Sequence, residues 1–323
     1  MAHLQFPNKR TLSLDQPRIM GILNVTPDSF SDGGEWLDRD AAVAHGLAMA
    51  AMGADVIDVG GESTRPGAER VPAAEQIRRV IGVIEHLRQG LDEHYPDVAI
   101  SIDTTIAGVA AAAIDAGATM CNDVAAGGED SDMFELVAAR GVPVVLMHMG
   151  GHPATMQESP QYDNVVAEVK SFLVERAQAA IESGIRSQQL LIDPGIGFGK
   201  TKDHNLALLA NLNEFVATGL AVLIGTSRKR FMGAICRRPA GLIQHKDAEP
   251  NPPLAPPETS DTPSLPVPPE SSPEPAPHER VGATCATTAL GVAAGAVMFR
   301  VHDVQANRQA VDIAWAVTRA SRP

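Results

Sequence analysis

Three polar residues that could recognise a heterocycle stand at or near the ends of short apolar runs. Asp103 ends "VAISID", Asn122 lies near the end of "ATMCND", and Asp193 lies in "LLIDPG". A carboxylate accepts hydrogen bonds, whereas an amide both accepts and donates them. Such a ring suits a planar amino-pyrimidinone edge, which offers N–H donors beside a carbonyl acceptor. Strand-end capping explains any single Asp or Asn about as well, but three on converging segments favour a binding site.

Cationic side chains gather in loops that follow other apolar runs. They are Arg65 in "GGESTRPGA", Arg228 and Lys229 in "GTSRKRF", and Arg300 and His302 in "FRVHD". Arginine matches the geometry of phosphate oxygens, so cations at one mouth of an acidic protein indicate an anionic substrate. Surface solvation or ion pairing is the alternative explanation for these cations. It explains Arg300 less well, because Arg300 stands between two apolar residues.

Two loops, "TPDSFSDGG" and "GGESTRPGA", are rich in Gly, Pro, Ser and Thr. Their composition suits mobile lids over a substrate, although purely structural turns would have the same composition. The stretch "GIGFGK" has a Gly-x-Gly-x-Gly spacing but lacks the spacing of a dinucleotide-binding fingerprint. The sequence contains no Ser-His-Asp order and no His-Glu-x-x-His, so a hydrolytic triad has no support.

The elements that must position these residues follow a regular order. Eight apolar runs, rich in β-branched and aliphatic residues, are typical of parallel strands buried on both faces. They lie in residues 18–24, 55–64, 98–103, 118–123, 142–149, 190–195, 221–229 and 296–303. Segments with helical spacing follow them, and many end at a glycine that can cap the helix: Gly53, Gly117, Gly141 and Gly184.

A strand followed by a helix, eight times over, predicts a single (β/α)8 TIM barrel of the α/β class that spans residues 1–323. Polar residues at the carboxyl ends of the strands would then converge on one mouth. His148 and its neighbours in "LMHMGGHPATMQ" are expected on that rim.

One stretch interrupts the alternation of strands and helices. Residues 237–279 contain 13 of the 24 prolines of the chain and few large apolar residues. Such a segment can form neither the interior of a helix nor that of a sheet. We therefore expect a disordered insertion between the seventh strand and the seventh helix, not a second domain.

Composition narrows the class of protein further. The net charge is −13 and the isoelectric point is about 5.2, which argues against a general nucleic-acid surface. Three scattered cysteines fit neither a disulfide framework nor a zinc knuckle. No apolar run is long enough to span a bilayer, and the N-terminus lacks the order of a signal peptide. A cytoplasmic protein without membrane or nucleic-acid partners is expected.

Six ordered blocks of the chain resemble the signature blocks of the dihydropteroate synthase family. They are "ILNVTPDSFSDGG", "GADVIDVGGESTRPGA", "LMHMGGHPATMQ", "IDPGIGFGKT", "GTSRKRF" and "FRVHDV". The resemblance covers nearly the whole chain outside the first dozen residues and the Pro-rich insertion. It implies a TIM barrel that forms a homodimer, uses Mg²⁺, and joins 6-hydroxymethyl-7,8-dihydropterin diphosphate to 4-aminobenzoate. The products would be 7,8-dihydropteroate, a precursor of folate, and pyrophosphate.

The resemblance also implies a role for particular residues. The pterin ring would be held by Asp103, Asn122, Met149, Asp193 and Lys229. The diphosphate would be held by Arg65, Arg300 and His302, and Mg²⁺ by Asn24. The 4-aminobenzoate would be surrounded by Thr64, Pro66, Phe198 and Ser227. The groups nearest the reaction would be Asp103, Asp193 and Lys229, whereas His148 is not expected to be a catalyst.

A cation-like, SN1-type path suits this chemistry, because the arylamine is a weak nucleophile and pyrophosphate leaves readily once its charge is spread. Asp103 and Asp193 would stabilise the developing cation electrostatically. Two other functions stay open at this point. A pterin-binding methyltransferase-type barrel would share the Asp/Asn/Asp ring without needing the diphosphate clamp. A non-catalytic pterin-binding module would bind the ring and release no pyrophosphate.

Overall fold

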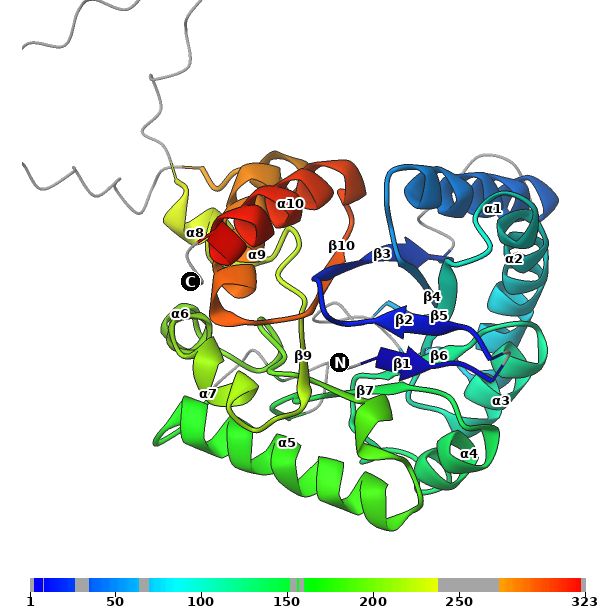
Figure 1. Ribbon diagram of the computed structural model, residues 1–323, viewed down its shortest axis with the longest axis horizontal. Helices are drawn as coiled ribbons and strands as arrows, with labels where there is room; N and C mark the ends of the chain where they lie inside the picture. Colours follow the sequence, from blue (N-terminus) through cyan, green and yellow to red (C-terminus); the bar gives the residue numbers. More distant parts are fainter. Residues whose placement is uncertain are drawn as a thin grey trace, which may run out of the picture.

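The structure is a computed structural model that describes residues 3–7, 9–26, 35–63, 70–151, 156, 160–237 and 273–320, with side chains of the first helix from residue 39 on. All eight predicted strands are present and form a closed parallel barrel (Figure 1) in the order β10-β3-β4-β5-β6-β7-β8-β9. The strands are β3 Arg18–Asn24, β4 Val56–Gly60, β5 Ala99–Asp103, β6 Met120–Asp123, β7 Val144–Met147, β8 Leu190–Asp193, β9 Ala221–Ile224 and β10 Met298–Val301.

Helices surround the barrel, and the predicted helical segments are confirmed. They are α1 Glu35–Ala51, α2 Ala73–His94, α3 Ala107–Asp115, α4 Met133–Arg140, α5 Val165–Glu182, α6 Lys202–Ala210, α7 Leu212–Val216, α9 Val281–Ala294 and α10 Val304–Ala320. A further helix, α8 Arg230–Ile235, and two 3₁₀ turns, η2 Ser187–Gln189 and η3 Pro277–Arg280, were not predicted. Gly53, Gly117, Gly141 and Gly184 all adopt positive φ angles just after helices, as the sequence suggested.

The helical segment that follows β8 is divided between α6 and α7 at Asn211. The Asn211 side chain donates through Nδ2 to the carbonyl of Ala207 (2.8 Å), and its backbone has φ −117° and ψ 29°. Asparagine competes in this way with the regular helical hydrogen bonds. The helix is therefore interrupted by local side-chain chemistry and not by a glycine or proline.

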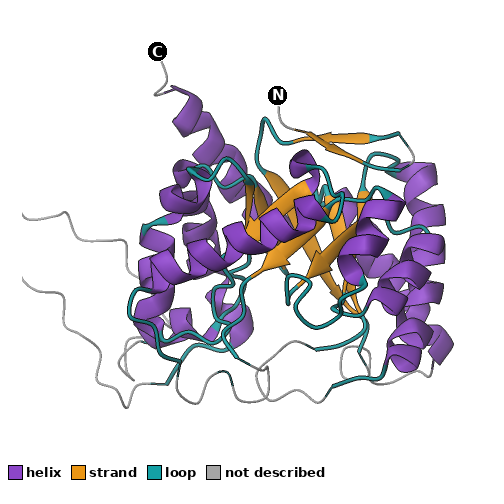
Figure 2. Cartoon of the chain, turned by 90° about the horizontal axis from the view of Figure 1, so that it is seen from below, coloured by secondary structure: helices purple, strands orange, loops and turns teal. Residues whose placement is uncertain are grey.

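A short antiparallel hairpin precedes the barrel and was missed from the sequence. It consists of β1 His3–Gln5 and β2 Thr11–Ser13. Its apolar side chains pack with one buried residue from each barrel strand, in the cluster Leu4, Phe6, Leu12, Leu14, Met20, Val56, Ala99, Met120, Val145, Leu191, Leu223 and Met298. Figure 2 shows the hairpin across one end of the barrel, with the strand arrowheads pointing toward the other end. The amino-terminal end of the barrel is thus sealed by apolar contacts, which leaves the carboxyl ends to form a site.

Most of the predicted Pro-rich insertion, residues 238–272, lies outside the described residues. The two described ends of the excursion meet, because Arg237 donates through Nη2 to Glu274 Oε1 (2.7 Å). Glu274 also lies 3.9 Å from an Nη2 of Arg280. The prediction counted Arg237 and residues 273–279 as part of the insertion. In the structure these residues, which lie between β9 and α9 in the chain, are held by contacts of Glu274 with Arg237 and Arg280. Among the helices of the described residues, none is long and apolar enough to cross a membrane.

The meeting of the two ends makes the excursion removable. We expect that replacing residues 238–272 by a Gly/Ser linker of about eight residues changes the Tm by less than about 3 °C, because loop closure entropy varies only with the logarithm of length. Thermal unfolding followed by circular dichroism measures this. The matched control is Glu274→Gln in the full chain, which weakens the Arg237 contact and leaves the length unchanged. Loss of cooperative unfolding in the shortened chain alone would contradict the prediction.

Candidate active site

The predicted heterocycle anchors come together at the carboxyl ends of the strands. Asp103 and Asn122 are direct register partners on the neighbouring strands β5 and β6. Both side chains are buried, as is Asp193 at the end of β8. Because the barrel is closed and all eight strands are parallel, their last residues face one common mouth. The structure therefore places the three residues as the sequence pattern requires.

Asp58 is a central residue of this site that sequence reasoning did not assign. It lies in the middle of β4 and is fully buried. Its Oδ2 accepts from Nε of Arg300 (2.6 Å) and from Nδ2 of Asn122 (3.0 Å). The signal in the sequence was a carboxylate inside an otherwise apolar strand, which needs a partner when it is buried. Asp58 fixes the amide of Asn122 and the guanidinium of Arg300 at the same time.

Arg300 joins two carboxylates. Besides Asp58, its Nη2 donates to Asp103 Oδ2 at 2.6 Å. Burial raises the pKa of Asp103 to about 7, against the opposing effect of the Arg300 charge, and the neighbouring Asp58 raises it further. The second carboxylate oxygens, Oδ1 of Asp58 and Oδ1 of Asp103, have no hydrogen-bond partner among the described residues. Buried acceptors without partners are unfavourable, so this mouth is ready to accept N–H donors from a ligand.

Asp193 lies across the mouth from this cluster. Its Oδ1 accepts from the backbone N–H of Gly195 (2.7 Å). Burial raises the pKa of the Asp193 carboxyl, opposed first by the charge of Lys229. Gly225 lies between the two sides, because a Cβ there would be 3.6 Å from Asp193 Oδ2 and 3.9 Å from Cβ of Arg300. Gly225 thus marks the point where the Asp193 side and the Arg300 side of the mouth approach each other.

Lys229 extends the site toward the loop that follows β8. Its ammonium donates to the carbonyl of Ile196 and lies 4.2 Å from the ring centroid of Phe198, in cation–π geometry. Burial lowers the pKa of Lys229 to about 7, while Asp193 acts in the opposite direction. Lys229 is therefore held between a predicted pterin anchor and a predicted wall of the aminobenzoate site.

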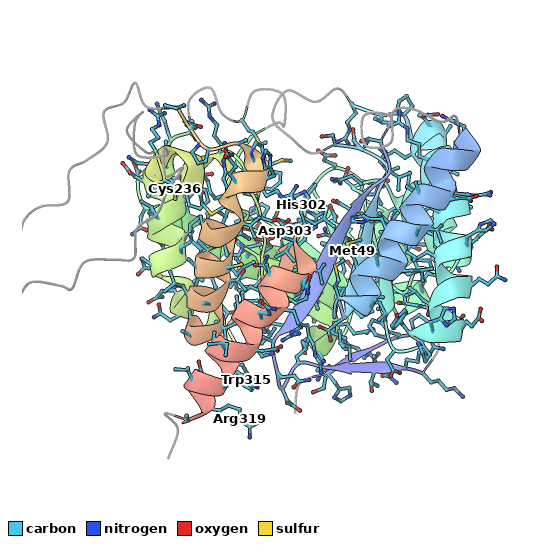
Figure 3. The ribbon with its side chains drawn as sticks, turned by 90° about the horizontal axis from the view of Figure 1, so that it is seen from above. Met49, Cys236, His302, Asp303, Trp315 and Arg319 are labelled. Carbon is cyan, nitrogen blue, oxygen red and sulfur yellow. The ribbon has the colours of Figure 1, made fainter. Side chains whose placement is uncertain are left out.

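Two other predicted cationic residues, His302 and Arg228, have different hydrogen-bond partners. Ser227 Oγ accepts from the backbone N–H of His302 (3.0 Å) and lies 2.9 Å from its Nδ1, so these two predicted site residues are joined. Arg228, in contrast, forms a two-pronged ion pair with Asp303 (2.9 and 2.5 Å). Figure 3 shows His302 and Asp303 at one end of α10, with Trp315 and Arg319 at its other end. Arg228 and Arg300 are thus both paired with carboxylates, Arg228 with Asp303 and Arg300 with Asp58 and Asp103.

Three of the predicted site residues, Thr64, Arg65 and Pro66, lie outside the part of the chain that the structure describes. So does most of the two proposed lid loops, namely residues 27–34 of "TPDSFSDGG" and residues 64–68 of "GGESTRPGA". Met149 is described and is half-buried directly after β7. Its neighbour His148 has its pKa lowered to about 3 by burial and by the charge of Lys200, so its imidazole is neutral at physiological pH. The expectation that His148 is not a catalyst stays a prediction.

A metal ion would find few protein ligands here. The described residues contain no group of three His, Cys, Asp or Glu side chains that could hold one. Asn24 ends β3, and a Cβ on Gly60 would lie 3.8 Å from its Oδ1 and 3.7 Å from Asp103 Oδ2, so the amide lies beside the acidic cluster. Mg²⁺ commonly takes one or two protein oxygens and completes its octahedron with water and substrate phosphate. The residues present fit such a weakly ligated ion.

Comparisons with known proteins agree with this geometry. Residues 20–302 match the family model described as pterin binding enzyme. A dihydropteroate synthase of Mycobacterium leprae is 42% identical over 307 residues, which cover 94% of this chain and 95% of that protein. The structure of Xanthomonas albilineans dihydropteroate synthase with 4-aminobenzoic acid is 42% identical with a TM-score of 0.79, and covers 100% of this chain and 99% of that one. The same enzyme in complex with 7,8-dihydropteroate gives 40% identity and a TM-score of 0.76, covering 99% and 100% of the two chains.

The barrel with its acidic mouth is that of a pterin-binding protein, and the chain belongs to the pterin binding enzyme family. Its similarity to dihydropteroate synthases extends over nearly the full length of both chains.

Asp58 provides a test of the site. We expect Asp58→Asn to lower the affinity for 6-hydroxymethylpterin by about 10- to 100-fold, because Arg300 and Asn122 lose the charged acceptor that orients them. Titration calorimetry measures this affinity. The matched control is Asp55→Asn near the other end of β4, where Asp55 binds Arg18 (2.9 Å) away from the mouth. Equal affinity in the two variants would show that Asp58 has no part in binding.

Proposed function

We propose that this chain condenses 6-hydroxymethyl-7,8-dihydropterin diphosphate with 4-aminobenzoate to give 7,8-dihydropteroate and pyrophosphate, which makes it a transferase of folate biosynthesis. The observation that carries the proposal is the buried acidic mouth, where Asp103 keeps an acceptor oxygen without a partner beside Arg300. Full-length similarity to dihydropteroate synthases supports it.

The pterin ring fits the acidic side of the mouth. Its amino-pyrimidinone edge carries N–H donors that suit the carboxylates of Asp103 and Asp193. The amide of Asn122 donates through Nδ2 to Asp58, which leaves its Oδ1 as an acceptor for another ring N–H. Lys229 contributes a donor for a ring acceptor, and Met149 contributes an apolar wall under the ring.

The diphosphate would be held by Arg65, Arg300 and His302. Mg²⁺ bound by Asn24 would neutralise part of the charge of the leaving pyrophosphate. Arg228, which forms its ion pair with Asp303, is not assigned to this anion site. The place of Asn24 at the end of β3, where its Oδ1 and the Asp103 carboxylate both lie near Gly60, supports the metal proposal.

The 4-aminobenzoate would lie against Phe198, Ser227, Thr64 and Pro66. The Phe198 ring, with the Lys229 ammonium 4.2 Å from its centroid, offers an apolar face beside a cation. A planar aromatic carboxylate has both matching features. The Xanthomonas albilineans relative in complex with 4-aminobenzoic acid supports this choice of second substrate.

The reaction then needs no side-chain nucleophile. The bond between the exocyclic methylene carbon and the diphosphate oxygen breaks first, and both bonding electrons leave with pyrophosphate. The electron-rich dihydropterin delocalises the positive charge, and ionised Asp103 and Asp193 stabilise it in a site with little water. The lone pair of the arylamine nitrogen then forms the new C–N bond, and the nitrogen gives up one proton to water or to the released pyrophosphate.

One assay separates this function from its alternatives. Wild-type protein mixed with the pterin diphosphate, 4-aminobenzoate and Mg²⁺ should release one pyrophosphate for each dihydropteroate formed. A methyltransferase-type barrel or a non-catalytic pterin-binding module would release none, and that result would refute the proposal. The predictions of a homodimer and of a cytoplasmic location stay predictions.

Arg300→Ala tests the diphosphate clamp. We expect the affinity for the pterin diphosphate to fall by at least about tenfold more than the affinity for bare 6-hydroxymethylpterin, because charge-assisted hydrogen bonds to the anion are lost. Calorimetry with both ligands gives the ratio. Some loss for the bare pterin is expected too, since Asp58 and Asp103 then lack their shared cation. Arg228→Ala is the control, and an equal loss for both ligands in Arg300→Ala would make Arg300 an anchor of the carboxylates alone.

Pterin affinity should depend on pH. The Asp103 carboxyl has a pKa of about 7, and a protonated carboxyl accepts N–H donors poorly. We expect affinity for 6-hydroxymethyl-7,8-dihydropterin to fall by up to about tenfold per pH unit as pH drops below about 7. The stability of the free protein has the opposite slope from this group. Its folded pKa is raised above the unfolded value, so its contribution to stability declines as pH rises from about 4 to about 7. Calorimetry and thermal unfolding at several pH values measure both, and affinity that rises on acidification would contradict the prediction.

A further inference from the structure

Lys200 is a buried lysine that the reaction outlined above does not use. It stands between the loop after β8 and helix α6, and only 3% of it is exposed. Its Nζ lies 2.9 Å from Nδ1 of His148, 3.0 Å from the carbonyl oxygen of Phe198 and 3.4 Å from the carbonyl oxygen of His148. An ammonium has three N–H donors, and here it meets three acceptors. Because His148 is neutral, its Nδ1 is able to accept.

The three acceptors belong to two different loops that press against each other. His148 donates its backbone N–H to the carbonyl of Asp193 (3.0 Å), and Gly150 donates to that of Phe198 (3.5 Å). The approach leaves no space for a side chain: a Cβ on Gly195 would lie 1.8 Å from the His148 carbonyl oxygen, and one on Gly199 would lie 2.1 Å from that of Gly150. Both glycines have positive φ, at 67° and 61°. The loop after β7 and the loop after β8 thus form one packed unit.

Each loop carries a predicted wall of the substrate site. Met149, expected under the pterin ring, lies between His148 and Gly150. Phe198, expected beside the aminobenzoate, is the residue whose carbonyl oxygen Lys200 binds and whose ring lies beside the ammonium of Lys229. Lys200 therefore contacts the backbone behind both walls.

The ring of His148 is fixed from its other sides by aromatic contacts. Phe172 of α5 lies edge-on, with ring centroids 4.9 Å apart, and Tyr162 lies at 6.1 Å. Tyr162 also donates its hydroxyl to the carbonyl of Gly199 (3.0 Å). The imidazole cannot swing away from Lys200 without losing this packing, so the pair has one defined geometry.

From this geometry we infer that Lys200 and His148 are a positioning pair for the condensation. Their hydrogen bond fixes the spacing between the Met149 wall and the Phe198 wall, and so the distance over which the two substrates meet. The inference rests on the proposed function. A displaced Phe198 wall weakens the contact with 4-aminobenzoate before the chemical step, so the loss is measurable as a higher KM for that substrate.

A lysine at this place is not required for packing alone. Burying an ammonium is unfavourable unless a carboxylate pairs with it. In the described part of the chain the charge of Asp193 favours the ammonium of Lys200, but the two groups form no ion pair. Burial lowers the pKa of Lys200 to about 7, which reflects that cost. We expect Lys200 to orient the two loops that it contacts, because its three hydrogen bonds point in fixed directions.

The test is a double-mutant cycle on the full chain. Lys200→Met keeps an unbranched side chain and removes the ammonium, and His148→Leu removes the acceptor but keeps bulk. Each should raise KM for 4-aminobenzoate about tenfold and lower kcat less than about threefold. The double variant should show about the same tenfold rise and not a hundredfold one, because both changes remove the same contact. His148→Asn, whose Oδ1 takes the place of Nδ1, should stay within about threefold of wild type.

The control is Lys202→Met, two residues farther on, where the side chain is 53% exposed. It should leave KM and Tm unchanged. Independent, multiplying effects of Lys200→Met and His148→Leu on KM would show that the two residues act separately. A lower Tm with unchanged KM would make the pair purely structural. Either result would overturn the inference. If Lys200→Met does not fold, the contrast between His148→Leu and His148→Asn decides in the same way.

A failure of the proposed function would be recognised separately, since wild-type protein would then form no dihydropteroate. In that case the affinity for 6-hydroxymethylpterin, measured by calorimetry, is the readout for the Met149 wall. It should fall at least about threefold in Lys200→Met and not in Lys202→Met, as expected for a contact that orients a binding wall. Equal affinities would overturn the inference.

Discussion

Two buried carboxylates that share one guanidinium set the conditions for the whole mouth of the barrel. Asp58 and Asp103 both bind Arg300 at 2.6 Å. Charges in such a place are tolerated only when they are paired and hydrogen-bonded, and here one arginine serves two acids. Strands of a closed parallel barrel hold all three groups rigidly, so the site cannot relax by moving them apart. The residual shortage of donors, seen in the two carboxylate oxygens without partners among the described residues, is what a ligand rich in N–H groups can satisfy.

The same logic applies to the cations on the opposite side. Lys200 and Lys229 are both held at a pKa of about 7 by burial, yet they bind different things. Lys229 lies beside Asp193 and the Phe198 ring, whereas Lys200 binds only backbone oxygens and His148. One lysine thus faces the site and the other lies behind its walls. The contacts of each lysine, and not its charge, distinguish these two roles.

Much of this arrangement could be predicted from sequence, because parallel strands buried on both faces leave long apolar runs and their polar ends must converge. Asp103, Asn122 and Asp193 were found in that way. Asp58 was not, since it stands inside a strand and its partner Arg300 is 242 residues away. The hairpin of β1 and β2 was missed because strands of three residues carry too few positions for a periodic pattern. The association of Lys200 with His148 depends on how two loops pack, which no local pattern records.

The closure of the barrel has a consequence for how the protein is made. β10 is the last strand, and it completes the ring by pairing with β3 and β9. Arg300 lies on this strand, whereas Asp58 and Asp103 are on β4 and β5, which leave the ribosome 242 and 197 residues earlier. Until β10 arrives, Asp58 and Asp103 lack the arginine that they share. Final docking of the last strand and assembly of the binding site are therefore a single event, and a nascent or truncated chain that lacks β10 has neither a closed barrel nor a competent site.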